Sequence, residues 1–250
     1  MPRRLENRRA LVTGASRGIG RAIAIAFAAE GADVAFCHDD DPEGAAAVVT
    51  AIQSHGCQAL AIQCDVADGA AVQRLWAEGE RMLGPIEILV NNAGIGGEQP
   101  FEAIDLATFD RMIAVNLRAV FHLAQLVAPG MRTRRWGRII NIASQLAYKG
   151  APGLAHYCAA KAGVVGLTRA LAAELAGSGV LVNAIAPGMT ETRLNEGLSA
   201  DWKARKLQEL PIRRFGTPDE IAPTAVLLAS SDGDFYVGQT LSPNGGDVFL

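Results

Sequence analysis

Short apolar runs alternate with longer alanine-rich segments along the whole chain of 250 residues. The runs are rich in Val, Ile and Leu, which is typical of strands buried on both faces, and they lie at 9–14, 32–37, 57–66, 86–94, 137–144, 179–188 and 238–243. The segments between them have the length of helices, and glycine or proline marks several of their ends. This alternation predicts an α/β fold: a doubly wound, Rossmann-type sheet of seven parallel strands with helices on both faces.

The domain organisation follows from the same pattern. No repeat, low-complexity tract or linker interrupts it, so residues 1–250 are expected to form a single domain. Long helices are expected from about Thr108 to Met131 and from about Leu154 to Ala176. The stretch from about Gly188 to Arg214 is polar and irregular, and so long a connection inside a compact domain is usually functional, so we expect a substrate lid there.

The charge and cysteine content exclude several classes of partner. The net charge is −3, with 23 basic and 26 acidic residues, which gives no basis for a nucleic acid or an anionic membrane as partner. No run approaches the roughly 18 apolar residues of a spanning helix. The four cysteines and four histidines lack metal-binding spacings, so no metal is expected, and free thiols favour a cytoplasmic location.

A glycine-rich turn, "LVTGASRGIG", joins the first predicted strand to the first predicted helix. One glycine at the turn allows unusual backbone angles, one that faces the ligand lets a pyrophosphate approach the chain, and the third lets the helix pack closely on the sheet. The free N–H groups at the start of the helix then bind phosphate. The turn therefore predicts a dinucleotide site that includes Gly14, Ser16, Arg17, Gly18, Ile19 and Gly20.

Two further turns follow predicted strands, at the edge where open α/β sheets bind ligands. Asp65 and Val66 are expected to contact an adenine, through a side chain and a backbone N–H. Asn92 and Gly94 are expected beside the adenosine ribose, whereas Asn91 is expected to tie two strands together.

Catalytic chemistry is indicated by "YCAAK", in which Tyr157 and Lys161 are four residues apart and therefore share one face of a helix. A free tyrosine has a pKa of about 10, and a nearby ammonium group lowers it. Ser144, at the end of the fifth strand, can offer its hydroxyl to the same substrate oxygen.

These pieces together resemble the short-chain dehydrogenase/reductase family. The similarity runs from Arg8 to about Gly246 and includes "TGASRGIG", "CDV", "LVNNAG", "VNL", "NIAS", "YCAAK" and "NAIAPGMTET". The resemblance implies an oxidoreductase that transfers a hydride between a nicotinamide cofactor and a secondary alcohol or ketone. It also implies the homotetramer that the family usually forms.

The resemblance implies a role for each matching catalytic residue. Tyr157 is the general acid/base, and Lys161 lowers its pKa and binds the nicotinamide ribose. Ser144 hydrogen-bonds the reacting oxygen, and Asn116 holds a water that links Lys161 to solvent. Around the nicotinamide, the resemblance implies a turn and carboxamide contacts formed by Pro187, Gly188, Thr190 and Thr192.

The form of the cofactor is indicated by two opposing signals. Arg17 resembles the basic residue of family members that use NADP. Asp39, with Asp40 and Asp41 after it, places negative charge near the ribose, which repels a 2′-phosphate and accepts from a 2′-hydroxyl. NAD is therefore favoured and NADP is the alternative; Asp40 and Asp41 are expected to be solvated and to cap the helix after Pro42.

The substrate is indicated only by a polar set of residues: Glu98, Gln145, His156 and Asn195, with Glu191 and Arg193 of the lid. Such groups favour a polyhydroxylated substrate, and the family's sugar dehydrogenases also carry a histidine before the tyrosine. We therefore predict an NAD-dependent sugar or polyol dehydrogenase. The alternatives are a 3-oxoacyl thioester (β-ketoacyl) reductase, for which Arg132–Arg138 could contact a carrier protein, and a non-catalytic NAD-binding partner protein.

Overall fold

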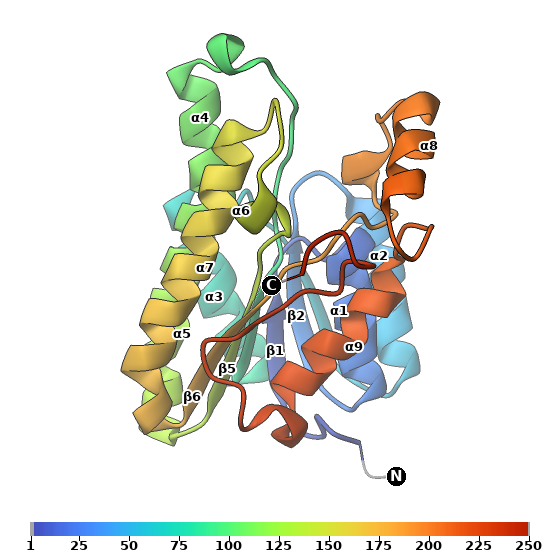
Figure 1. The fold of residues 1–250 in the computed structure, drawn as a ribbon. Helices are drawn as coiled ribbons and strands as arrows, with labels where there is room; N and C mark the ends of the chain where they lie inside the picture. Colours follow the sequence, from blue (N-terminus) through green and yellow to red (C-terminus); the bar gives the residue numbers. More distant parts are fainter. Residues whose placement is uncertain (1–2, 250) are drawn as a thin grey trace.

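Seven parallel strands form one sheet in the order β3–β2–β1–β4–β5–β6–β7 (Figure 1). In this computed structural model, which describes residues 3–249, the strands are β1 (Arg9–Val12), β2 (Asp33–His38), β3 (Ala59–Gln63), β4 (Ile88–Asn91), β5 (Gly137–Ile142), β6 (Val180–Ile185) and β7 (Thr240–Leu241). The predicted fold class is confirmed. The strand order reverses between β1 and β4, and a ligand crevice is expected outside their carboxyl ends.

Helices cover both faces of the sheet and bury two apolar layers. On one face lie α1 (Gly18–Ala29), α2 (Pro42–Ser54) and α9 (Pro218–Ala229), and on the other lie α3 (Gly69–Leu83), α5 (Ala119–Arg134) and α7 (Ala155–Leu175) (Figure 1). Phe27 of α1 and Phe36 of β2 are fully buried in the first layer, and Leu75 of α3 in the second. Burial of such side chains stabilises each by roughly 1.5–3 kcal/mol, which holds the strand ends, and therefore the site, in place.

The long helix expected at 108–131 is interrupted by a π-helical turn. It consists of α4 (Leu106–Ile113), the turn η2 (Ala114–Arg118) and α5. By length and composition Leu106–Arg134 could cross a membrane, but half of its most apolar window is buried. Leu123 and Val127 pack in the second core layer, so we interpret it as a core helix.

The stretch 188–214 is more ordered than the sequence suggests. It contains the short 3-10 turn η4 (Arg193–Asn195) and α8 (Ala200–Glu209), and Thr190 pairs with Gly216 in an isolated bridge. The remaining elements are η1 (Phe101–Ala103), α6 (Leu146–Lys149), η3 (Ala176–Ser178) and η5 (Ser231–Gly233). Figure 1 shows α6 and α8 near the carboxyl end of the sheet, where they can enclose a substrate; closure as a lid stays a prediction.

Candidate active site

The glycine turn has the backbone geometry that its sequence predicts. Gly14 and Gly18 have φ values of +63° and +57°, which side chains disfavour. A Cβ on Gly14 would lie 2.9 Å from the Cα of Ala93, and one on Gly20 would lie 2.4 Å from Nδ2 of Asn92. Gly20 is thus required by the protein's own packing, whereas Gly14 and Gly18 also line the cavity described below.

Two neighbouring asparagines hold the strand ends together. Asn92 donates from Nδ2 to the carbonyls of Thr13 (2.9 Å) and Gly14 (3.0 Å), so it fastens the glycine turn to the end of β4. Asn91 donates to Oδ1 of Asn141 on β5 at 2.9 Å, which is the expected tie between strands. Asn92 also lines the cavity, and its contact with a ribose stays a prediction.

A cavity of about 1100 Å³ opens at the carboxyl ends of the strands. Its lining includes nearly all the predicted site residues: Gly14, Ser16, Arg17, Gly18, Ile19, Asp39, Asp65, Val66, Asn92, Gly94, Glu98, Asn116, Ser144, Gln145, Tyr157, Lys161, Pro187, Gly188, Thr190, Thr192 and Asn195. The topology therefore brings cofactor, catalytic and substrate candidates into one continuous space.

His156 and Gly20 are not among the lining residues. His156 is only 2% exposed, so the structure does not place it against the substrate as expected. The reason is helical geometry: successive side chains on α7 are turned by about 100°, and it is Tyr157 that lines the cavity. Gly20 packs against the side chain of Asn92, where a larger residue would not fit.

Tyr157 and Ser144 both line the cavity and are joined by a hydrogen bond. Burial raises the pKa of Tyr157 to about 12, although a hydrogen bond with Ser144 counteracts part of this shift. Ser144 Oγ also accepts from the backbone N–H of Leu146 at 3.1 Å, which orients its hydroxyl. In this state the phenol is protonated at neutral pH and can donate a proton.

Lys161 is held beside the tyrosine by the end of β5. Its Nζ donates to the carbonyl of Ile142 at 2.8 Å and lies 5.7 Å from the centre of the Tyr157 ring. Burial lowers the pKa of Lys161 to about 8. Burial is the largest cause of the pKa shift of both groups, and the Lys161 ammonium donates to a carbonyl; the lowering of the Tyr157 pKa by Lys161 stays a prediction.

Asn116 occupies the π-helical turn and is fully buried. Its Nδ2 donates to the carbonyls of Ile95 (3.1 Å) and Met112 (3.2 Å), while Oδ1 has no hydrogen-bond partner among the described residues. A Cβ on Gly94 would lie 2.8 Å from this oxygen and 3.6 Å from Nζ of Lys161. Gly94 thus leaves room between them, which fits the expected water or the edge of a ribose.

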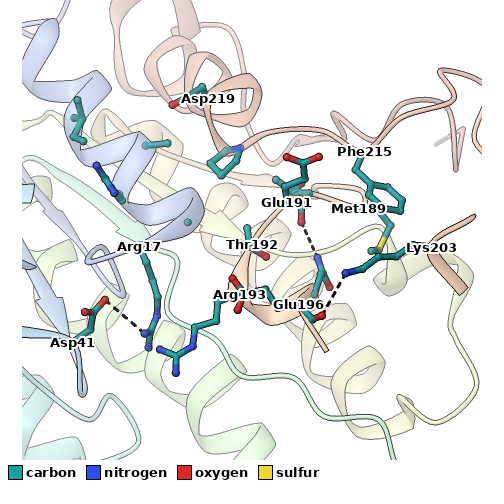
Figure 2. Close-up of a pocket in the computed structure, with 17 residues that line it drawn as sticks. Arg17, Asp41, Met189, Glu191, Thr192, Arg193, Glu196, Lys203, Phe215 and Asp219 are labelled. Carbon is teal, nitrogen blue, oxygen red and sulfur yellow. Dashed lines mark hydrogen bonds and ion pairs between the residues drawn. The ribbon is translucent and has the colours of Figure 1, made fainter. Parts of the chain in front are cut away.

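The adenosine end of the cavity carries paired charges. Arg17 contacts Asp40 at 3.1 Å. It also contacts Asp41 at 3.6 Å (Figure 2). Asp41 also caps α2 by accepting from the N–H of Gly44, as expected for a helix that begins at Pro42. Asp39 lines the cavity, is exposed, and forms no ion pair among the described residues.

At the adenine position, Asp65 is already engaged by the protein. Arg111 binds its carboxylate at 2.8 Å, and that hydrogen bond is the main cause that lowers the pKa of Asp65. Arg111 was not predicted, because nothing in its spacing connects α4 to the end of β3.

A second cavity, of about 890 Å³, adjoins the first along α1 and α9 (Figure 2). Their shared lining includes Arg17, Thr192 and Arg193, so Arg193 is a further cation beside the expected cofactor site. Asn195, predicted to contact the substrate, donates from Nδ2 to the carbonyl of Thr190 at 2.8 Å and so holds this segment in shape.

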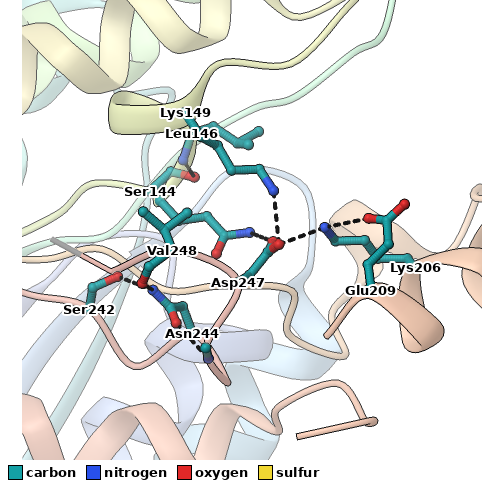
Figure 3. A network of polar contacts seen from close by, with 11 residues as sticks. Ser144, Leu146, Lys149, Lys206, Glu209, Ser242, Asn244, Asp247 and Val248 are labelled. Atoms are coloured by element: carbon teal, nitrogen blue, oxygen red, sulfur yellow. Dashed lines mark hydrogen bonds and ion pairs between the residues drawn. The ribbon is translucent and has the colours of Figure 1, made fainter. Parts of the chain in front are cut away.

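The substrate end contains three charged residues that sequence reasoning missed. They are Lys149 of α6, Lys206 of α8 and Asp247 of the C-terminal segment, which all line the cavity, and each lysine contacts the Asp247 carboxylate (Figure 3). Within residues 3–249 there is no group of three His, Cys, Asp or Glu side chains that could hold a metal ion.

The residues of the cavity fit a nicotinamide dinucleotide. Glycines lie where a pyrophosphate has to approach the backbone, and the first backbone N–H groups of α1 can donate to it. The unpartnered Oδ1 of Asn116 and the small Gly94 leave space beside Lys161 for the ribose end.

Comparison with known proteins agrees with this geometry. The family model for short chain dehydrogenases matches residues 8–203. The chain is 43% identical over 240 residues to the 3-oxoacyl-[acyl-carrier-protein] reductase FabG of Staphylococcus epidermidis, covering 96% of this chain and 98% of that protein.

Solved structures match over nearly the full length. One, from Beutenbergia cavernae with bound NADP, is of a protein proposed to be an NAD(P)-dependent gluconate 5-dehydrogenase; it has a TM-score of 0.93 and 39% identity, and the match covers 99% of each chain. Another is a short chain dehydrogenase from Burkholderia cenocepacia in complex with NADP, with a TM-score of 0.90, 37% identity and coverage of 98% of this chain and 99% of that one. The chain therefore belongs to the short-chain dehydrogenase/reductase family and is an oxidoreductase that acts on CH–OH and ketone groups.

Proposed function

We propose that this enzyme interconverts a ketone and a secondary alcohol on a small substrate that carries further hydroxyl groups. The observation that carries the proposal is the position of Gln145. It follows Ser144, lines the cavity, is 3% exposed, and has a side-chain carbonyl without a partner among the described residues. A buried acceptor of this kind favours a ligand that offers a hydrogen-bond donor.

The residues act on the reacting oxygen. Tyr157, kept protonated by burial, donates its proton from Oη to the ketone oxygen, while the Ser144 hydroxyl donates a hydrogen bond to the same atom as charge develops there. When bound, the nicotinamide supplies the hydride. Lys161 holds the ribose, and Asn116 Oδ1 accepts from a water through which the proton is replaced.

A second candidate substrate is a 3-oxoacyl thioester, and the sequence comparisons favour it. The curated relative from S. epidermidis has this activity at 43% identity, above the 39% of the gluconate 5-dehydrogenase neighbour. Against this candidate stands the charged far end of the cavity, formed by Lys149, Lys206 and Asp247, since an acyl chain is better bound by apolar walls.

For the cofactor we propose a preference for NAD, with NADP as the alternative. Two acids already neutralise Arg17, and Asp39 remains to repel a 2′-phosphate. The neighbours solved with NADP favour the alternative.

A homotetramer in the cytoplasm is also proposed. Leu106, Phe109 and Phe121 on α4 and α5 are 80%, 38% and 48% exposed, which supports burial of this helix pair against another copy. Light scattering on the purified protein tests the number of subunits.

One panel of substrates tests the function. Purified enzyme is assayed by nicotinamide absorbance with aldoses, polyols and hydroxy acids plus NAD, and with small ketones and acetoacetyl-CoA plus NADH or NADPH. We expect a hydroxylated compound to have a higher kcat/KM than the thioester. Turnover of the thioester alone would establish the second candidate instead.

A further inference from the structure

The carboxylate of Asp247 is the centre of a buried polar network at the substrate end of the cavity (Figure 3). Its Oδ1 accepts from Nζ of Lys149 at 2.9 Å and from Nζ of Lys206 at 2.7 Å, and its Oδ2 accepts from Nε2 of Gln145 at 2.6 Å. The Asp247 side chain is only 7% exposed. One carboxylate thus joins α6, α8 and the residue that follows Ser144.

The two lysines keep this carboxylate ionised and in place. Burial alone would raise the pKa of Asp247, but the hydrogen bonds from Lys206 and Lys149 lower it below its ordinary value. Lys206 is itself largely buried, and Glu209 binds its ammonium group from the solvent side at 3.0 Å. Because both lysines can only donate, they require an oxygen of residue 247 to face them.

Gln145 is held by its two neighbours in space. Its backbone N–H donates to the carbonyl of Pro187 at 3.2 Å, which places it between Ser144 and the nicotinamide turn. Its Nε2 is bound by Asp247, and its Oε1 is buried without a partner among the described residues. The reversed amide would set its carbonyl against the carboxylate, two acceptors with no proton between them, so Asp247 fixes which amide atom remains free.

We infer that Asp247 is a specificity-determining residue: it orients the Gln145 amide so that Oε1 accepts a hydrogen bond from a substrate hydroxyl near the reacting carbon. It acts through Gln145 and is therefore a positioning residue. A substrate without this hydroxyl leaves the buried carbonyl unpaired, which weakens its productive binding by about tenfold or more. The inference rests on the proposed function and names the group that the enzyme selects.

The test compares compounds that differ by one hydroxyl group. Wild type is assayed for reduction of acetoin and of 2-butanone, and the inhibition constants of 2,3-butanediol and 2-butanol are measured against whichever substrate the enzyme uses, the thioester included. We expect the hydroxylated member of each pair to be favoured by about tenfold or more. Because inhibition is measured against any active substrate, a failure of the proposed function leaves this test intact.

The decisive variant is Asp247→Asn, which keeps the size of the side chain. The lysines then take the single amide oxygen of residue 247, and its NH₂ faces Gln145, so the Gln145 amide turns and leaves Nε2, instead of Oε1, to pair with a substrate. A hydroxyl can accept as well as donate, so the variant is judged with 2,3-butanedione, whose second oxygen can only accept. The preference for acetoin over 2,3-butanedione should fall at least about tenfold through KM in the variant.

A second variant and a control complete the design. Asp247→Leu combined with Lys206→Met removes the Asp247 carboxylate and the Lys206 ammonium together, leaves the Gln145 amide free to turn, and should lower the same preference. The control is Asp234→Asn, which breaks the ion pair between Asp234 and Arg138. Neither residue lines the cavity, so this variant should leave the preference unchanged. Equal or absent inhibition by the two alcohols in wild type, or a preference for acetoin over 2,3-butanedione that survives in both Asp247 variants, overturns the inference.

Discussion

Replacement of Gly14 by alanine should reduce the free energy of unfolding by an amount that can be divided into strain and packing. Gly14 has a φ of +63°, a conformation that costs an L-residue about 1–2 kcal/mol. The alanine Cβ would also lie 2.9 Å from the Cα and 3.2 Å from the Cβ of Ala93, and such overpacking costs about 1–3 kcal/mol. The alanine also reduces the conformational freedom of the unfolded chain, which offsets about 0.4–1 kcal/mol, so the expected loss is about 1–4.6 kcal/mol.

Gly56→Ala is the matched control. Gly56 follows α2, is exposed, and has a φ of +81°, but a Cβ there would meet nothing within 4 Å. The free energy of unfolding of this variant should fall by only about 1 kcal/mol, which is the backbone strain minus the gain from the less flexible unfolded chain. Urea denaturation followed by circular dichroism, without cofactor, measures both variants, and the difference between them is the contribution of the contact with Ala93.

The same pair of variants links the turn to cofactor binding. Gly14 lines the cavity and Gly56 does not, so Gly14→Ala should weaken NADH binding about tenfold, or 1.4 kcal/mol, and Gly56→Ala should leave it unchanged. NADH fluorescence titration measures this. If the two variants lose the same free energy of unfolding and the same NADH affinity, the close approach to Ala93 does not explain the glycine.

Three further predictions concern the chemistry of the cavity. Tyr157→Phe should bind the cofactor normally but lower turnover by at least about a hundredfold, measured by nicotinamide absorbance; turnover near that of wild type would exclude Tyr157 as the proton donor. The pKa of Lys161 is about 8 in the folded protein and 10.5 for the free group, so the unfolded chain binds more protons between these pH values. The free energy of unfolding of wild type should therefore rise with pH across this interval, relative to Lys161→Met, by up to about 3 kcal/mol. Urea denaturation at about pH 8 and about pH 10 checks this, and parallel profiles for the two proteins would contradict it. Asp39→Arg should raise the ratio of kcat/KM for NADPH to that for NADH by at least about tenfold, and a wild type that already prefers NADPH would show that Arg17 outweighs the acids.

The fold could be predicted from the sequence because a buried parallel strand needs an apolar run and a crossover needs a helix. The run at 32–37 became β2 at Asp33–His38, a shift of one residue. The strand predicted at 57–66 is longer than β3, which ends at Gln63. Asp65 lies beyond it, and its carboxylate accepts hydrogen bonds from the backbone N–H of Ala67 and from Arg111. The π-helical turn at Asn116 could not be predicted from the sequence, because one extra residue in a helical turn hardly alters the spacing of apolar residues.

The candidate site could be predicted where its residues are neighbours in the sequence. The glycine turn and the pair Tyr157 and Lys161 lie on single elements, so spacing alone places them together. His156 shows the limit of a positional analogy, because one step along α7 turned it away from the cavity lining into the core. The raised pKa of Tyr157 also could not be derived, because it depends on burial, which spacing does not report.

Substrate selection is hidden from the sequence for a different physical reason. Gln145 and Asp247 are 102 residues apart, and Lys206 reaches the same carboxylate from α8, which no strand of the sheet precedes directly. The rule that strand ends gather at one edge brings Ser144 to the cofactor but says nothing of a segment beyond the last strand. Reaction type is therefore encoded in local spacing, whereas the selection of a substrate hydroxyl that we propose depends on one carboxylate whose partners meet only after the chain has folded.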